Sequence, residues 1–213
     1  MTTSFPFSDS FPSVSDVCIT TSYTLRQRRI VDALCILVGE SAPAMYEAHD
    51  RSLMKLAGFV RGSALPACQR LATGLQLAQE LLVEELVMAP AFASPNAVAN
   101  YMKLHFAGQM HESFVVLFLS AQHHLLACEA MFRGTLTQTS VYPREVIKPA
   151  LHHNAAAVIL AHNHPSGSTE ASRADEVLTR TLSTALALVD VRVLDHLIIA
   201  GGRSLSMAEH GLI

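Results

Sequence analysis

The sequence predicts an α/β or α+β domain preceded by a small all-α domain. The first 87 residues contain only helical patterns, whereas short apolar runs and helical patterns alternate from about residue 93 to the end. Half of the 213 residues are apolar and 15% are charged, so the chain can bury a sizeable core. That length accommodates one domain, or one domain with a small accessory domain.

The N-terminal part is expected to be a tail followed by helices. Residues 1–22 hold ten Ser or Thr with two prolines, and we interpret them as a disordered tail. The tail lacks Lys, Arg and any continuous apolar run, which argues against a signal or transit peptide. Apolar residues at helical spacing then predict helices over 24–38, from Leu53, and over 64–87. Residues 23–88 are therefore expected to form a helical N-terminal domain.

The second part combines strands and helices. Residues 89–95 are typical of a linker, and Ser94–Pro95 supplies an N-cap and first position for a helix. The run FVVLFL is continuous and apolar, as in a strand buried on both faces. We expect strands over 114–119, 125–132, 156–161 and 191–200 with a short one around Leu205, and helices over 143–153 and 172–189.

Charge, cysteines and hydropathy exclude several classes of protein. A formal charge of −3 gives no global electrostatic reason for a nucleic-acid or membrane partner. The four cysteines are scattered, which suits reduced thiols better than disulfides or a thiolate zinc site. Apolar runs end well before the roughly 18 residues that a membrane span needs. We expect a cytoplasmic protein, of undetermined oligomeric state, that does not associate with membranes.

Histidines indicate where the chemistry lies. Of the 11, all but His49 lie at or after His105. His162 and His164 stand two apart at the end of the run VILA, so on an extended chain both rings project to one face. Asp175 falls in the first turn of the next expected helix. Two imidazoles and a carboxylate suit Zn²⁺, with a fourth position open for water.

Two other interpretations of these residues stay open at this point. Ser172 and Asp175 have the spacing of a helix capping box, which any helix can use. The two histidines can also form a hydrogen-bonded polar pair at a strand end. The occurrence of both patterns, separated by one tight turn, favours the metal site.

The spacing H-x-H, seven residues, Ser, two residues, Asp matches the motif of the JAMM (MPN+) metalloprotease domains. The segments FRGTLTQTSVYPREVIKPAL, AAAVILAHNHPSG and ALVDVRVLDHLIIAGG closely resemble the RadC-like branch of that superfamily. The resemblance covers about residues 94–213. It implies a JAB/MPN-like catalytic domain over 93–213, with a mixed β-sheet flanked by helices.

The resemblance also implies roles for individual residues. His162, His164 and Asp175 would be zinc ligands, and Ser172 would stabilise the developing oxyanion or the bound water. Glu112, just before the first core strand, would be the general base, a role for which the pattern of residues alone does not separate it from Glu129, Glu145 or Glu170. His196, in the LDHLII strand, is expected to be a buried hydrogen-bonded histidine, with a role behind the metal ligands as the alternative.

Two features depart from the family pattern. Relatives of this kind carry a helix-hairpin-helix segment before the catalytic domain, with turn glycines that approach DNA phosphate. Here the corresponding residues 60–63 have largely lost those glycines, so the N-terminal domain is a degenerate version and nucleic acid is a weakly supported partner. Pro149 lies inside the expected helix 143–153, where we expect a kink or a fresh helical start.

These features lead to a ranked set of functions. The first is a zinc-dependent hydrolase that acts on a peptide or isopeptide bond of a peptide or protein substrate. The second is a DNA-repair-associated accessory protein whose metal domain is structural or a recruitment surface. A metal-dependent nuclease ranks lowest, because the H-N-H letters of such nucleases stand far apart on a ββα hairpin.

Overall fold

The computed structural model describes residues 23–91, 95–133 and 141–213, in two compact units divided between Gln76 and Leu77. The predicted tail 1–22 and the predicted N-cap Ser94 lie outside the described residues. Within the described ranges, the structure has no helix that is both long and apolar enough to cross a bilayer.

The first unit is a set of short helices around one apolar core. They are α2 (Leu25–Val38), the 3₁₀ turn η1 (Gly39–Ser41), α3 (Ala42–Ala48), α4 (Leu53–Arg61) and the start of α5 (Pro66–Met88). Thr24 caps α2 through a capping box, and Gly39 ends it with a φ of +77° that glycine tolerates. Helix α3 was not predicted. Its core side chains include Met45 and Tyr46.

The second unit is built on a five-stranded mixed sheet in the order β2-β1-β3-β4-β5. The strands are β1 (Ser113–Leu119), β2 (Leu125–Arg133), β3 (Ala157–Asn163), β4 (Arg192–Ala200) and β5 (Arg203–Ser206). Strand β1 runs antiparallel to both β2 and β3, whereas β3 and β4 are parallel and are connected through α8 (Arg173–Ala187). The predicted mixed sheet flanked by helices is confirmed.

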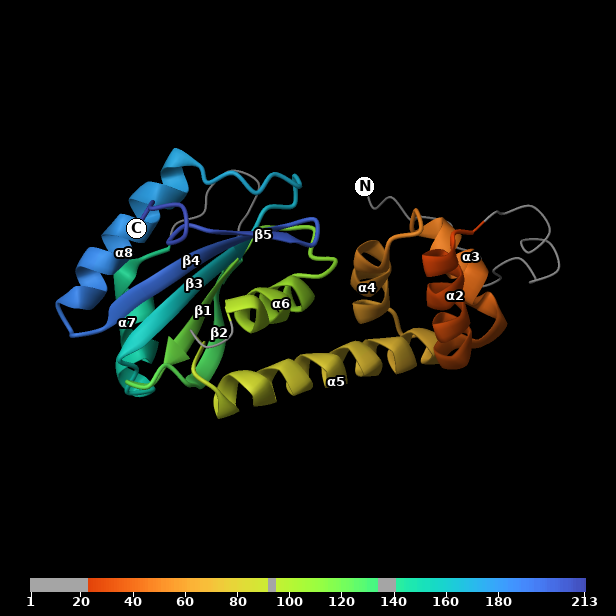
Figure 1. The fold of residues 1–213 in the computed structure, drawn as a ribbon, viewed down its shortest axis with the longest axis horizontal. Helices are drawn as coiled ribbons and strands as arrows, with labels where there is room; N and C mark the ends of the chain where they lie inside the picture. Colours follow the sequence, from red (N-terminus) through yellow and green to blue (C-terminus); the bar gives the residue numbers. More distant parts are fainter. Residues whose placement is uncertain (1–22, 92–94, 134–140) are drawn as a thin grey trace, which may run out of the picture. The chain divides into compact units, whose positions relative to one another are not determined.

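Helices cover both faces of this sheet (Figure 1). Helix α8 and α7 (Pro143–His152) cover one face, where Val116 and Leu160 of the sheet pack with Leu182 and Leu186. Helix α6 (Pro95–His105) and the end of α5 cover the other, where Val115 and Ile159 belong to a second apolar cluster. Alternate residues of β1 therefore enter opposite layers, and all seven are buried, as expected for FVVLFL.

Helix α7 and strand β3 differ from the expectation. Helix α7 continues through Pro149 as one element, so the predicted fresh start is wrong. Pro149 is the seventh of its ten residues, and the preceding turns already hold the helix in place against the sheet through Val146. Strand β3 includes His162 and Asn163 rather than ending at Ala161, because its pairing with β1 and β4 extends to these residues.

Two leucines at the C-terminal end of α8, one buried and one exposed, provide a test of how this helix packs on the sheet. Leu186 is fully buried in the core, whereas Leu188 is 84% exposed. We expect Leu186→Ala to lower the free energy of unfolding by about 2–5 kcal/mol, because it removes buried methyl groups and leaves a cavity. Leu188→Ala should stay within about 0.5 kcal/mol of the parent chain. Urea unfolding followed by circular dichroism measures both, and equal losses would contradict the described packing.

Candidate metal centre

The sequence-predicted site residues meet at one end of the sheet. Antiparallel pairing places Phe114 opposite His162, so Glu112, just before β1, comes next to the end of β3. His164 follows β3 directly, and the chain then turns to the start of α8. Three segments that are separate in the sequence thus supply the polar side chains.

Both histidines and Asp175 present their ligand atoms to one another. The Nε2 atoms of His162 and His164 are 2.8 Å apart. Asp175 Oδ1 lies 3.2 Å from Nε2 of His162, and Oδ2 lies 3.7 Å from Nε2 of His164. His162 is 2% and Asp175 7% exposed, so little bulk water separates these atoms.

Glu112 also lies close to the two histidines. A carboxylate oxygen of Glu112 and one nitrogen each of His162 and His164 all lie within 4.8 Å of one another. Glu112 is half-buried, whereas His162 is fully buried. The structure therefore brings Glu112 to the rim of the same group of donor atoms.

At the start of α8, Ser172 and Asp175 cap the helix, and Asp175 also turns a carboxylate oxygen toward the histidines. Ser172 Oγ accepts from the Asp175 amide at 3.2 Å, and Asp175 Oδ2 accepts from the Ser172 amide at 2.8 Å. The capping box that the sequence left open as an alternative is present. It fixes the carboxylate with Oδ1 toward His162, and the Ser172 hydroxyl keeps its own proton to donate.

Hydrogen bonds keep Asp175 ionised. Burial raises the pKa of its carboxyl, but the hydrogen bond and charge of His162 and the two hydrogen bonds from Ser172 outweigh this. The net result is a pKa well below the ordinary value for aspartate. The carboxyl group is therefore anionic at neutral pH.

Asn163, for which no role was predicted, connects the segment around Glu112 to β3. Its Oδ1 accepts from the Ser113 amide at 2.8 Å, and its Nδ2 donates to the His111 carbonyl at 3.0 Å. The two bonds hold the peptide groups on either side of Glu112. Because side chains alternate along a strand, that of Asn163 points away from those of His162 and His164. The alternation does not identify the partners of Asn163, which follow only from the pairing of β1 with β3.

The outer nitrogens of the two histidines also have partners. His164 Nδ1 lies 2.9 Å from the Ser168 carbonyl, and His162 Nδ1 lies 2.8 Å from Nε2 of His196. His196 is fully buried, as expected, and its ring contacts that of His162. Burial, with the nearby charge of His162, lowers the pKa of His196 to about 3, so this ring is neutral at physiological pH.

The donor set fits zinc. The Ser168 carbonyl only accepts hydrogen bonds, so His164 Nδ1 carries the proton and its Nε2 has a free lone pair when the ring is neutral. In a tetrahedral site with Zn–N bonds of 2.0–2.1 Å, neighbouring ligand atoms lie roughly 3.3 Å apart. The two Nε2 atoms lie 2.8 Å apart, Asp175 Oδ1 lies 3.2 Å from His162 Nε2, and Asp175 Oδ2 lies 3.7 Å from His164 Nε2, so these distances fall on both sides of that value.

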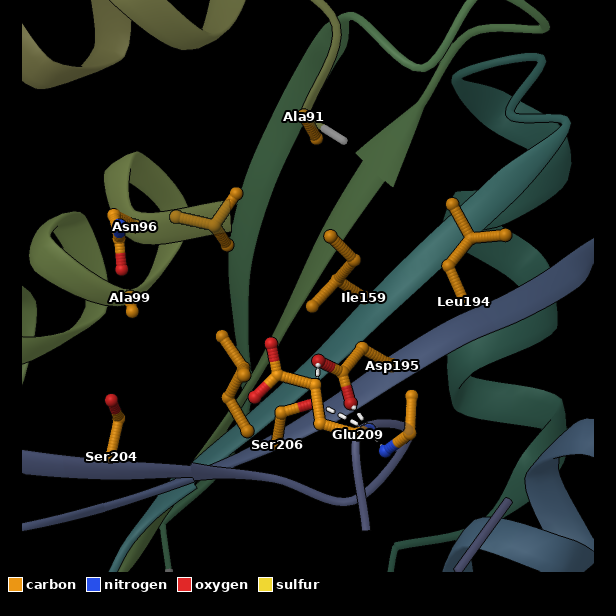
Figure 2. Close-up of a pocket in the computed structure, with 12 residues that line it drawn as sticks. Ala91, Asn96, Ala99, Ile159, Leu194, Asp195, Ser204, Ser206 and Glu209 are labelled. Atoms are coloured by element: carbon orange, nitrogen blue, oxygen red, sulfur yellow. Dashed lines mark hydrogen bonds between the residues drawn. The ribbon is translucent and has the colours of Figure 1, made fainter. Parts of the chain in front are cut away.

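A separate pocket lies between the sheet and α6 (Figure 2). It has a volume of about 250 Å³ and is lined by residues of α6, β4 and β5 that include Asn96, Asp195 and Ser204. The Asp195 carboxylate already accepts hydrogen bonds from the Ser206 hydroxyl at 2.6 Å and from the Ala208 amide at 3.0 Å. Those contacts explain Asp195 as a structural anchor for the turn after β5.

Comparison with known proteins gives one family model and a set of similar proteins. The family model described as RadC-like JAB domain matches residues 92–212, more than half of the chain. A UPF0758 protein of Acidovorax sp. (strain JS42) is 63% identical over 139 residues, which cover 65% of this chain and 58% of that protein. A UPF0758 protein of Methylibium petroleiphilum is 56% identical over 156 residues, 73% of this chain and 70% of its own length. The chain thus matches less than two thirds of the length of the first of these relatives.

The role of Asn163 is testable by hydrogen exchange. Asn163→Ala removes the acceptor of the buried Ser113 amide, which should cost about 1–3 kcal/mol of stability and speed exchange of that amide. Asn100→Ala, on the exposed face of α6, is the control and should change neither quantity. Unchanged exchange at Ser113 in Asn163→Ala would contradict the tie between β3 and the Glu112 segment.

Proposed function

The chain belongs to the RadC-like JAB domain family, and from this we propose that it is a zinc-dependent hydrolase of the JAMM metalloprotease type. The observation that carries the proposal is the convergence of two imidazole nitrogens and a carboxylate oxygen. Three protein ligands with one open position are the usual arrangement of a catalytic rather than a structural zinc site.

The ligands would be Nε2 of His162, Nε2 of His164 and Oδ1 of Asp175. A bound zinc ion supplies Lewis acidity, which lowers the pKa of a coordinated water from 15.7 to about 7 and polarises a carbonyl group. Asp175 stays anionic through its capping hydrogen bonds, so it can neutralise part of the ion's charge. Burial of His162 and Asp175 strengthens these electrostatic interactions.

Glu112 would act as the general base. Its carboxylate faces the two histidines, and it would take a proton from water as the water oxygen bonds to the carbonyl carbon of the substrate. Glu112 would then pass that proton to the amine nitrogen as the C–N bond breaks. The Ser172 hydroxyl would donate to the oxygen that becomes negative in the tetrahedral state.

The substrate would be a peptide or an isopeptide-linked protein, because the proposed reaction hydrolyses an amide bond. We also place the activity in the cytoplasm, since the cysteines among the described residues form no disulfide, which suits a reducing compartment. The relatives carry only the name UPF0758, so their names add no substrate.

Metal content tests the ligand set. Purified protein should hold about one zinc ion per chain, and His162→Ala or Asp175→Ala should abolish retention, because each removes one of three protein ligands. His152→Ala, an exposed histidine of α7, is the matched control and should retain the metal. Elemental analysis after dialysis is the measurement. Full zinc content in both ligand variants would make this assignment wrong.

The general base is tested separately from the metal. Glu112→Gln should keep zinc but lose roughly 10²- to 10⁴-fold in hydrolysis, because the amide cannot accept the proton. Glu170→Gln, an exposed residue of the loop before α8, is the control and should keep both properties. Cleavage of peptide and isopeptide libraries by zinc-loaded protein provides the rate. A rate equal to that of the parent chain would remove Glu112 from the mechanism.

A further inference from the structure

A buried chain of hydrogen bonds runs from His162 away from the site and back to α8. His162 Nδ1 lies 2.8 Å from His196 Nε2, and His196 Nδ1 lies 2.5 Å from Thr179 Oγ1. Thr179 Oγ1 lies 2.6 Å from the Asp175 carbonyl. His196 and Thr179 are 0% and 1% exposed, so this chain is closed to bulk water. The proposed hydrolase chemistry gives neither residue a role.

The donor and acceptor of every hydrogen bond in this series follow from the group at its end, the Asp175 carbonyl. A backbone carbonyl only accepts, so the Thr179 hydroxyl must give its single proton to Asp175 O. The sulfur of Met207, 3.7 Å from Thr179 Oγ1, is a weak acceptor and does not compete with that carbonyl. Thr179 Oγ1 must therefore accept from His196, which places the proton of that ring on Nδ1.

The same logic fixes the proton of His162. A neutral imidazole with its proton on Nδ1 has an unprotonated Nε2, so His196 Nε2 accepts from His162 Nδ1. A neutral His162 is then left with a lone pair on the Nε2 that faces His164 and Asp175. His164 reaches the same tautomer by a shorter route, a direct bond to the Ser168 carbonyl.

We propose that Thr179 and His196 are positioning residues that hold His162 in the tautomer able to bind zinc. The proposal rests on the proposed function, since it concerns a ligand of that metal site. The reversed chain is disfavoured because it would leave Thr179 Oγ1 and the Asp175 carbonyl as two acceptors in contact, 2.6 Å apart. Partners of this kind orient a ligating histidine and raise its basicity.

The test uses the full chain, stripped of metal, and zinc itself as the probe. Thr179→Val keeps the shape of the side chain but cannot accept from His196, so zinc affinity should fall roughly 10- to 100-fold. Thr179→Ser restores the hydroxyl and should restore the affinity. Thr184→Val is the matched control on the same helix, because Thr184 makes the same bond to the carbonyl four residues earlier, at 2.9 Å, away from the metal site.

A second readout follows the protons directly. Long-range ¹H–¹⁵N spectra of the metal-free chain should show His196 protonated on Nδ1 and unprotonated on Nε2. In Thr179→Val that assignment should be lost or mixed, while Thr184→Val should keep it. This measurement on the parent chain tests the proposal even if Thr179→Val fails to fold.

The possible results separate this inference from the proposed function. Zinc binding by the parent chain with equal affinity in Thr179→Val would overturn the positioning role and leave the hydrolase proposal standing. His196 protonated on Nε2 in the parent chain would also overturn it. A parent chain that binds no zinc, but shows His196 protonated on Nδ1, would overturn the metal site while the direction of the hydrogen-bond chain holds.

Discussion

The second unit depends on the close approach of two imidazole nitrogens and a carboxylate oxygen, because such atoms carry lone pairs and a negative charge. The Nε2 atoms of His162 and His164 lie 2.8 Å apart. Asp175 Oδ1 lies 3.2 Å from His162 Nε2 and Oδ2 lies 3.7 Å from His164 Nε2, and both His162 and Asp175 are almost fully buried. Lone pairs and a negative charge at such distances repel one another unless a proton or a metal ion is shared among them. Nδ1 of His164 bonds to a carbonyl, and Nδ1 of His162 connects to another carbonyl through His196 and Thr179. Moving a proton from Nδ1 to Nε2 within a neutral ring would break these hydrogen bonds, so it cannot relieve the repulsion.

The fold supplies this arrangement through strand pairing and one helix cap. Antiparallel β1 carries Glu112 to the end of β3, and the side chain of Asn163 ties the two segments together. Parallel β4 places His196 behind His162, and the capping box of α8 aims Asp175 at both histidines. The hydrogen bonds of secondary structure therefore hold the donor atoms close to one another.

Local spacing was enough to predict part of the site, and register was needed for the rest. His162, His164, Ser172 and Asp175 lie within fourteen residues, so their grouping could be inferred from a strand end, a turn and a helix start. Glu112 was selected through family resemblance. It lies far from the two histidines in the sequence, so spacing alone does not distinguish it from the other glutamates as the general base. Asn163 and Thr179 act through partners on other elements, which no local pattern reveals. Helix α3 was missed because its seven residues are too few for a helical period to stand out.

The most direct test of the shared cation is anomalous diffraction at the zinc edge from crystals of the full chain grown with zinc. The account predicts one anomalous peak bonded to Nε2 of His162, Nε2 of His164 and Oδ1 of Asp175, with Zn–N distances of about 2.0–2.1 Å. Ordered crystals in excess zinc with no peak among these three atoms, or with the three side chains turned away from one another, would contradict it.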